Sequence, residues 1–186
     1  MVYELSQITK SICLAFNEAG IIYCITGGIA VSLMAEIRTT KDIDFIILLK
    51  ESQKHSIIPV LDQAVKLIQS HEDVMVRHGI PIWRHNMLSG DRKKVVSIDL
   101  ILANSEFLRS VLERRRKIRL LGITSYLISP EDLILLKLIS FRKQDELDIE
   151  NIIKSDETIE WNYLEKQIDI MKLNRDFIEQ LKKLPR

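Results

Sequence analysis

Cysteine, glycine and proline are all scarce in this sequence of 186 residues, which contains two cysteines, six glycines and four prolines. Two cysteines cannot build the disulfide framework of a small secreted domain, and Cys13 and Cys24 each lie among apolar residues, as buried thiols do. We therefore expect a cytoplasmic protein. With 46% hydrophobic residues, the sequence is also unlike that of a fibrous or disordered chain.

Long apolar segments and an excess of one charge are missing as well. No apolar run approaches the roughly 18 residues that a membrane-spanning helix needs. The first residues lack the basic segment and following apolar segment of a signal peptide. We predict neither secretion nor membrane insertion. The formal net charge is only +1, so overall charge indicates no class of partner.

The pattern of the sequence changes near residue 129. Before it, segments with helical periodicity alternate with β-like runs. The predicted helices are 3–19, 52–69 and 104 or 105 to about 115, and the predicted strands are 21–25, 42–49, 74–83, 94–103 and 117–128. A turn signal at 89–91 suggests that the runs 74–83 and 94–103 form a hairpin. A sheet of at least four strands should result.

A helical region is predicted to follow from Ser129 onward. Ser129 is a suitable N-cap, Pro130 suits the first helical position, and acids follow in the first turn. Helical periodicity then continues to the C-terminus. We expect an α+β fold, with a mixed sheet flanked by helices in residues 1–128. Residues 129–186 should form a C-terminal helical region packed on that core as a layer of the same unit.

Two aspartates at the start of one predicted strand are the most suggestive feature. Asp42 and Asp44 lie two residues apart, so both carboxylates should emerge on one face, about 6 to 7 Å apart at their α-carbons. Such like charges favour a cation between them, and hard oxygen ligands select Mg²⁺ or Mn²⁺. Asp99, in an otherwise apolar run, could supply a third carboxylate. Gly27 and Gly28, between strand and helix, could receive phosphate oxygens.

Each of these features has a commoner structural explanation when it is taken singly. Asp-x-Asp pairs and Gly-Gly pairs occur in many proteins, and an acid such as Asp99 more often bonds to backbone at the end of a strand. Their order along the chain is more specific: a strand, Gly-Gly, a helix, a basic approach with threonines, the Asp-x-Asp strand, and a separate acidic strand. This order favours a site that binds metal and phosphate.

The motifs resemble those of the polymerase-β-type nucleotidyltransferases. The resemblance is carried by Gly27-Gly28-Ile29-Ala30-Val31 and by Arg38-Thr39-Thr40-Lys41-Asp42-Ile43-Asp44-Phe45. Downstream, Ser129-Pro130-Glu131-Asp132-Leu133 with Lys137, and the segment from Gln144 to Ile149, resemble a second motif of the AbiEii and MenT toxin branch. The resemblance covers roughly residues 20 to 155. Two departures are Ala35-Glu36-Ile37 before Arg38, where glycine is usual, and Gln144, where a basic residue is usual.

The resemblance implies a metal-dependent nucleotidyltransferase that moves NMP from an NTP to an acceptor. It implies that Asp42, Asp44 and Asp99 are catalytic metal ligands for Mg²⁺ or Mn²⁺. It further implies that Gly27, Gly28, Arg38, Thr40 and Lys137 bind the nucleotide and that Lys137 and Asp148 assist catalysis. The expected acceptor is RNA, in particular tRNA, or else a protein side chain, and the expected partner is an antitoxin protein. A catalytically silent binding module and a transferase for a small molecule such as an aminoglycoside are the alternatives.

The second motif raises a geometric question. Lys137 and Asp148 would lie roughly 16 Å apart along one continuous helix, too far apart to act together. No glycine or proline interrupts residues 131–154, so the residues by themselves favour a continuous helix. The resemblance instead requires a bend near residues 141–145. Without such a bend, Lys137 is a solvated lysine and Asp148 caps a following helix.

Several other residues have simpler explanations. The basic segment Arg114-Arg115-Arg116-Lys117 is typical of a solvated helix end, and binding of RNA phosphates is the alternative. His71, His78 and His85 lack partners at zinc-ligand spacing, so we expect surface or sheet positions for them. Trp83 and Trp161 are expected to be packing residues rather than platforms on which bases stack.

Overall fold

The structure is a computed structural model that describes residues 2–35, 39–49, 51–89, 94–155 and 157–183. Its contacts divide the chain into two compact units. The first comprises Met1–Ile29 and Thr39–Ile128, and the second comprises Ala30–Arg38 and Ser129–Arg186. Helix α2 contributes residues to both units, because the division falls between Ile29 and Ala30.

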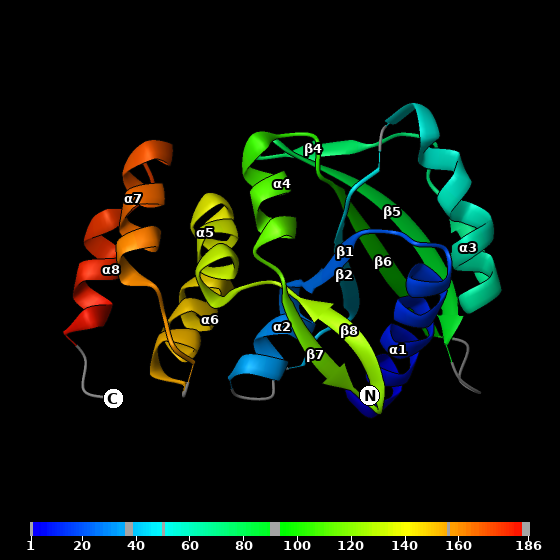
Figure 1. Cartoon of the computed structure of the whole chain (residues 1–186), viewed down its shortest axis with the longest axis horizontal. Helices are drawn as coiled ribbons and strands as arrows, with labels where there is room; N and C mark the ends of the chain where they lie inside the picture. The colour runs from blue at the N-terminus through cyan, green and yellow to red at the C-terminus, as the bar shows by residue number, and fades with distance from the viewer. Residues whose placement is uncertain (1, 36–38, 50, 90–93, 156, 184–186) are drawn as a thin grey trace. The chain divides into compact units, whose positions relative to one another are not determined.

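The first unit contains the β-sheet and most of the N-terminal helices (Figure 1). Its helices are α1 (Val2–Glu18), the start of α2 (Gly27–Met34), the 3-10 helix η1 (Glu51–Ser56), α3 (Ile57–Ala64) and α4 (Glu106–Glu113). Its strands are β1 (Tyr23–Thr26), β2 (Asp42–Ile47), β3 (Leu67–Ser70), β4 (Met75–Arg77), β5 (Ile80–Ser89), β6 (Lys94–Leu102), β7 (Arg116–Leu120) and β8 (Ile123–Leu127).

The strands form one mixed sheet of eight strands in the described residues. Seven of them run in the order β3-β5-β6-β2-β1-β8-β7, and β4 pairs with β5. β2 pairs parallel with β6 and antiparallel with β1, while β1 pairs parallel with β8. The predicted α+β class and mixed sheet are confirmed. Because β2 lies next to β6, the two acidic strands are neighbours although about fifty residues separate them.

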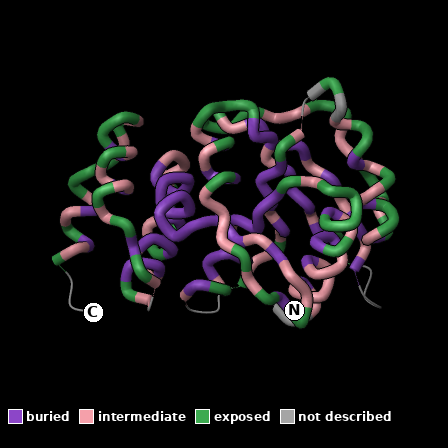
Figure 2. Tube along the Cα trace, viewed as in Figure 1, coloured by how far each residue is buried: buried purple, intermediate pink, exposed green. Residues whose placement is uncertain are grey.

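The second unit is helical apart from its connecting segments. Besides the end of α2, it contains α5 (Pro130–Ser140), α6 (Lys143–Lys154), α7 (Trp161–Met171) and α8 (Arg175–Lys182). Helix α5 is buried along nearly its whole length, whereas α8 is mostly half-buried or exposed (Figure 2). Helix α5 begins as predicted, because the Ser129 hydroxyl accepts a hydrogen bond from the Asp132 N–H and Pro130 occupies the first turn.

Aromatic packing fixes which face of the sheet is covered. Phe16 of α1 contacts Tyr23 of β1 and Phe45 of β2, with ring centroids 5.2 and 5.3 Å apart. Since side chains alternate along a strand, the residues next to Phe45 must point to the opposite face. The fully buried Trp83 of β5 shares the face of Phe45 by register, through Leu100 of β6. This face therefore holds the core of the first unit.

Two predictions about secondary structure need correction. The predicted helix 52–69 was too long, because Leu67–Ser70 instead pairs with β5 as the strand β3. The Asp62 carboxylate accepts a hydrogen bond from the Leu67 N–H at this helix-to-strand change. The hairpin is confirmed, but its first long strand is Ile80–Ser89, and of the predicted turn at 89–91 only Ser89 lies within the described residues.

Cys13 and Cys24 are both buried, as expected. Among the helices in the described residues, none combines the length and the apolar character needed to cross a membrane.

Candidate active site

Strand β2 presents two carboxylates on one face. Asp42 and Asp44 are half-buried, whereas Ile43 and Phe45 are fully buried. Because Phe45 packs against Phe16 of α1, the alternation of the strand turns both aspartates to the face of the sheet opposite α1. The predicted same-face geometry of Asp42 and Asp44 is thus present.

Gly27 closely contacts one of these carboxylates. Strand β1 ends at Thr26, the register partner of Asp44, and α2 begins at the next residue. Gly27 has a φ of +63°, in the left-handed region, and a Cβ built on it would lie 1.9 Å from Asp44 Oδ2. The Asp44 carboxylate therefore lies over the α-carbon of Gly27, where a larger residue would displace it. Gly28, the next residue of α2, is buried.

Asp99 joins the two aspartates through the register of the parallel strands β2 and β6. Asp44 pairs with Asp99, and Asp42 pairs with Ser97. Paired residues of neighbouring strands lie on the same face, about 4.8 Å apart in the sheet. The structure thereby brings together the three aspartates that the sequence motifs singled out.

Arg84 of β5 completes this group of charges. It is the register partner of Asp99, and it donates two hydrogen bonds, from Nε to Oδ1 at 2.7 Å and from Nη2 to Oδ2 at 2.6 Å. These bonds, with the charges of Asp42 and Asp44, raise the pKa of Arg84 above its already high usual range, although burial opposes the shift. We refer to Asp42, Asp44, Asp99 and Arg84 as the carboxylate cluster.

The approach to β2 contains two further predicted site residues. The Thr40 hydroxyl donates a hydrogen bond of 3.2 Å to the carbonyl oxygen of Asp42, which holds the chain in place as it enters the strand. Arg38 lies outside the described residues. Contacts of Thr40 and Arg38 with nucleotide stay predictions.

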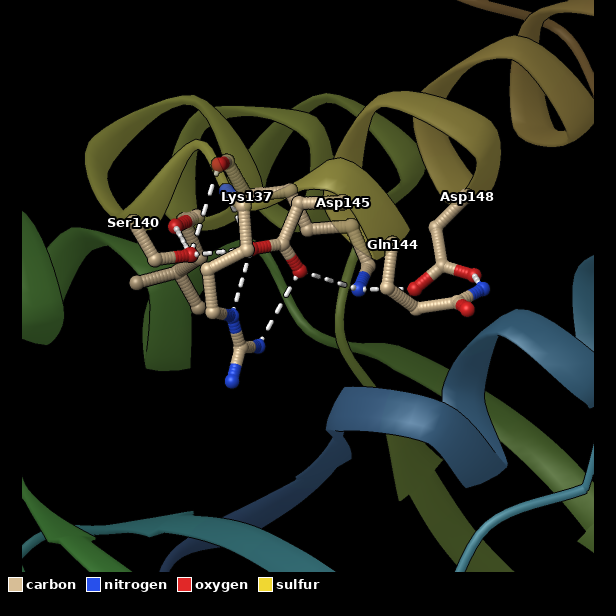
Figure 3. A network of polar contacts seen from close by, with 7 residues as sticks. Lys137, Ser140, Gln144, Asp145 and Asp148 are labelled. Atoms are coloured by element: carbon tan, nitrogen blue, oxygen red, sulfur yellow. Dashed lines mark hydrogen bonds and ion pairs between the residues drawn. The ribbon is translucent and has the colours of Figure 1, made fainter.

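The residues of the second motif meet in a buried network between α5 and α6 (Figure 3). Lys137 Nζ lies 2.5 Å from Asp148 Oδ2 and 3.3 Å from Asp145 Oδ1, and all three side chains are almost fully buried. Gln144 Nε2 donates to Asp148 Oδ1 at 3.2 Å. We call Lys137, Asp145 and Asp148, with their neighbours Ser140, Arg142 and Gln144, the lysine network.

A break between α5 and α6 makes this network possible. Phe141 adopts the left-handed conformation, with a φ of 40°, and ends α5. The Asp145 carboxylate then accepts hydrogen bonds from the Arg142 N–H and side chain and from the Ser140 hydroxyl. Burial opposes the charged form of Asp145, but these bonds outweigh it and hold the pKa of Asp145 below its usual range. The continuous helix that the residues themselves favoured is wrong, and the bend that the resemblance required is present.

Comparison with known proteins identifies the family. Residues 4–183 match the family described as "Nucleotidyltransferase of unknown function (DUF6036)". The chain belongs to this family of nucleotidyltransferases. It is thus a nucleotidyltransferase enzyme, as its carboxylate motifs predicted. No curated protein matches the chain.

Two solved structures are similar in fold to this nucleotidyltransferase. The solution structure of the antibiotic-resistance factor ANT(2'')-Ia has a TM-score of 0.63 and 12% sequence identity, and the match covers 92% of this chain and 93% of that one. The crystal structure of JHP933 from Helicobacter pylori has a TM-score of 0.51 and 16% identity, with 79% and 63% covered. At these identities the likeness establishes the fold alone. Membership of the AbiEii and MenT branch stays a prediction.

The predicted site residues are divided between the two units. Gly27, Gly28, Thr40 and the carboxylate cluster belong to the first unit, and Lys137 and Asp148 belong to the second. Within the first unit the structure brings the three aspartates to one face of the sheet. Within the second it pairs Lys137 with Asp148. The catalytic roles assigned to these residues stay predictions.

The carboxylate cluster fits a divalent cation in part. Asp42 and Asp44 supply hard oxygen donors from one face of β2, as Mg²⁺ and Mn²⁺ require. Asp99 instead uses both carboxylate oxygens to hold Arg84. Over the described residues, no three or more histidine, cysteine or acidic side chains converge on a position for a metal ion. The donor set in this conformation therefore fits two protein carboxylates rather than three.

Arg84 carried no motif that would have marked it as a site residue. Its place opposite Asp99 follows from the hairpin register, in which Ser89 pairs with Lys94 and each step back along β5 meets one step forward along β6. The turn signal at 89–91 was consistent with several registers. Knowledge of the closing pair would have been enough to place Arg84 beside Asp99.

The basic segment divides between a helix end and a strand. Arg114 is the C-cap residue of α4, and Arg115 stacks on Tyr126, with the guanidinium carbon 4.8 Å from the ring centroid. Arg116 and Lys117 already belong to β7, an edge strand of the described sheet, and Lys117 and Arg119 are exposed there. The prediction of a solvated helix end was therefore only partly correct.

The histidine and tryptophan predictions agree with the structure. His85 is fully buried in β5, and His71 and His78 lie at half-buried and exposed positions. Trp83 is a fully buried packing residue whose Nε1 donates to the His71 carbonyl oxygen at 2.6 Å. Trp161 is half-buried, with Lys182 Nζ 4.8 Å from its ring centroid.

Proposed function

We propose that this nucleotidyltransferase transfers NMP from an NTP to a hydroxyl group of RNA, most specifically tRNA, with Mg²⁺ or Mn²⁺ held by Asp42 and Asp44. The observation that carries the proposal is the placement of both carboxylates on one face of β2, with Asp44 against the Gly27 turn. A divalent ion bound there would neutralise the triphosphate and activate the attacking hydroxyl.

In this proposal the chain itself orients the triphosphate. Gly27 and Gly28 start α2, whose N-terminal N–H groups favour phosphate oxygens. The absence of a side chain at Gly27 lets phosphate and Asp44 approach the same turn. In transfer, the acceptor hydroxyl gives up its proton to solvent, its oxygen bonds to the α-phosphorus, and the bond between the α-phosphorus and pyrophosphate breaks, so that pyrophosphate leaves. Lys137 and Asp148 keep their proposed roles in phosphate contact and in positioning.

The basic edge strand β7 supports RNA as the acceptor. Lys117 and Arg119 are exposed on this strand, which lies three places from β2 in the order of the sheet. Strand spacing makes that about 14 Å, within the reach of a few nucleotides. Positive side chains at this distance would contact phosphates of an RNA whose end lies at the carboxylate cluster. We further propose that the enzyme acts in the cytoplasm as a toxin that a partner antitoxin neutralises.

The direct test is an acceptor survey with each of the four NTPs, labelled at the α-phosphate. Wild-type enzyme with Mg²⁺ should move label from at least one NTP to total cellular RNA, and chelation of the metal should stop it. Asp42→Asn should reduce transfer by roughly 100-fold or more, because the substitution removes a charged metal ligand. Full transfer by Asp42→Asn, or transfer in excess chelator, would contradict metal-dependent catalysis at this cluster.

The same survey separates the alternatives. Label on protein, or on a small hydroxylated compound such as an aminoglycoside, would keep the transferase and reject RNA as its acceptor. NTP binding seen by calorimetry, without transfer to any acceptor, would indicate a catalytically silent module. The toxin role predicts that expression of the active enzyme arrests growth and that Asp42→Asn does not.

The contribution of β7 can be measured by salt dependence. Lys117→Gln with Arg119→Gln should weaken RNA binding, and the slope of log affinity against log salt should fall by about 0.7 for each phosphate that the variant no longer neutralises. Lys143→Gln is the matched control, since Lys143 is an exposed lysine of α6. An unchanged slope in the β7 variant would exclude this strand from the RNA site.

A further inference from the structure

Arg84 bonds to the carboxylate oxygens of Asp99 that would otherwise be available to a metal ion. Its guanidinium meets both oxygens of Asp99 in a two-bond, side-by-side arrangement, at 2.7 and 2.6 Å. The Asp99 side chain is only 9% exposed, so little of it faces solvent outside this pair. Charge-assisted pairs of this geometry are among the stronger polar contacts in proteins.

The backbone on both sides holds Arg84 in position. Its strand neighbours Trp83 and His85 are fully buried on the opposite face, which anchors β5 against the core. The Arg84 carbonyl oxygen accepts a hydrogen bond of 3.1 Å from the His71 N–H, and β6 pairs along the other edge of β5. The guanidinium is therefore presented from a rigid strand rather than from a mobile loop.

The position of the Arg84 guanidinium affects which aspartates of the carboxylate cluster can bind a metal ion. Asp42, Asp44 and Asp99 share one face of two neighbouring strands, and Arg84 lies close enough to interact electrostatically with all three. A divalent ion that also coordinated Asp99 would have to approach the guanidinium closely. Two cations on one carboxylate repel each other, so Arg84 and the metal compete for Asp99.

We propose that Arg84 is the resident counter-cation of Asp99, so that the metal site of this enzyme consists of Asp42 and Asp44 and excludes Asp99 while the pair is intact. Arg84 and Asp99 are then positioning residues: they set the field around the metal without coordinating it. This inference rests on the proposed metal site. It differs from the role that the sequence resemblance implied for Asp99, which was a third metal ligand.

Direct metal binding distinguishes the two roles. Mn²⁺ affinity is measured by electron paramagnetic resonance on nucleotide-free protein, for wild type and for Asp44→Asn, Asp99→Asn and Arg84→Gln. Asp44→Asn should weaken binding by roughly 10- to 100-fold, whereas Asp99→Asn should change it by less than about 3-fold. Arg84→Gln should strengthen binding by about tenfold, because it frees a third carboxylate.

Two further variants keep the test decisive if Arg84→Gln folds poorly. The double variant Arg84→Gln/Asp99→Asn replaces the ion pair by two neutral side chains that can still hydrogen-bond, and it should bind Mn²⁺ within about 3-fold of wild type. Arg84→Lys keeps the charge but loses the two-bond fork, so its affinity should fall between those of wild type and Arg84→Gln.

Three results would overturn the inference: a reduction in affinity in Asp99→Asn as large as in Asp44→Asn, a failure of the double variant to bind, or no Mn²⁺ binding by wild type. The proposed function is tested separately by label transfer. Enzyme that binds Mn²⁺ in the expected pattern but transfers no label would contradict the proposed function and leave the role of Arg84 standing.

Discussion

The carboxylate cluster and the lysine network use the same chemical groups and balance their charges differently. In the lysine network, Lys137 and Arg142 stand against Asp145 and Asp148, two charges of each sign. The carboxylate cluster instead combines three aspartates with one arginine, and Asp42 and Asp44 are half-buried rather than enclosed. A buried network with matched charges is stabilised by its own ion pairs, so the loss of one partner is costly. A half-exposed cluster with excess negative charge suits the binding of a cation.

The largest expected effect on stability is in the lysine network. Lys137→Met should lower the free energy of unfolding by about 3 to 5 kcal/mol, because it leaves buried carboxylates without their lysine. Asp44→Asn should lower it by no more than about 1 kcal/mol, since the half-buried cluster loses repulsion together with a charge. Urea titration of both variants measures the contrast. Equal reductions in the free energy of unfolding would show that the lysine network depends on its charge balance no more than the carboxylate cluster does.

Mild acid should destabilise the fold through His85. Burial, together with repulsion from His71, lowers the pKa of His85 to about 4, although Asp99 opposes the shift. The unfolded chain binds a proton near pH 6.5 and the folded chain does not, so stability is complete above that pH and falls as the pH drops toward 4. The reduction should reach at most roughly 3 kcal/mol.

Substitutions of two histidines test whether His85 causes this pH dependence. His85→Phe should flatten the decline between pH 6.5 and 4, whereas His78→Asn, at an exposed position with positive φ, should leave it unchanged. The pKa of Asp145 is lowered instead. The stability that ionised Asp145 gives to the fold should therefore be lost only as the pH falls below the ordinary value of 3.8. A steep decline that persists in His85→Phe would assign the effect to another group.

Gly27 allows the carboxylate cluster to be disturbed without a change of charge. Gly27→Ala should cost about 1 to 2 kcal/mol through its left-handed backbone and should also displace Asp44, which reduces transfer. Gly20→Ala is a close control, because Gly20 has a φ of +66° and a Cβ there would meet nothing within 4 Å. Gly20→Ala should show the stability cost with normal transfer. Normal transfer by Gly27→Ala would mean that the position of Asp44 is not critical.

The smallest effect is expected at the rim of the lysine network. The Arg142 side chain is 70% exposed, although it contacts the buried Asp145. Arg142→Gln should therefore lower the free energy of unfolding by less than about 1 kcal/mol, far less than Lys137→Met. Thermal melting of the two variants under one buffer condition gives the comparison. A destabilisation in Arg142→Gln as large as in Lys137→Met would show that the exposed arginine is essential to the network.

The difference between the two regions also explains what could be predicted from the sequence. The strand, Gly27-Gly28, helix and Asp42-x-Asp44 order is local, so motif and periodicity were enough to predict it. Arg84 depends on the register of a hairpin, and β3 depends on pairing with β5, so neither could be read from a single segment. The break at Phe141 involves neither glycine nor proline. It is supported by Asp145 bonding to Ser140 and Arg142, contacts that only the folded chain shows.

The carboxylate cluster is tested most directly by label transfer from NTP to RNA by Asp44→Asn, compared with wild type at equal folded fraction. We expect wild type to transfer label in Mg²⁺ and Asp44→Asn, which stays folded, to reduce transfer by roughly 100-fold or more. Undiminished transfer by folded Asp44→Asn protein would contradict the assignment of the carboxylate cluster as the nucleotidyl-transfer centre.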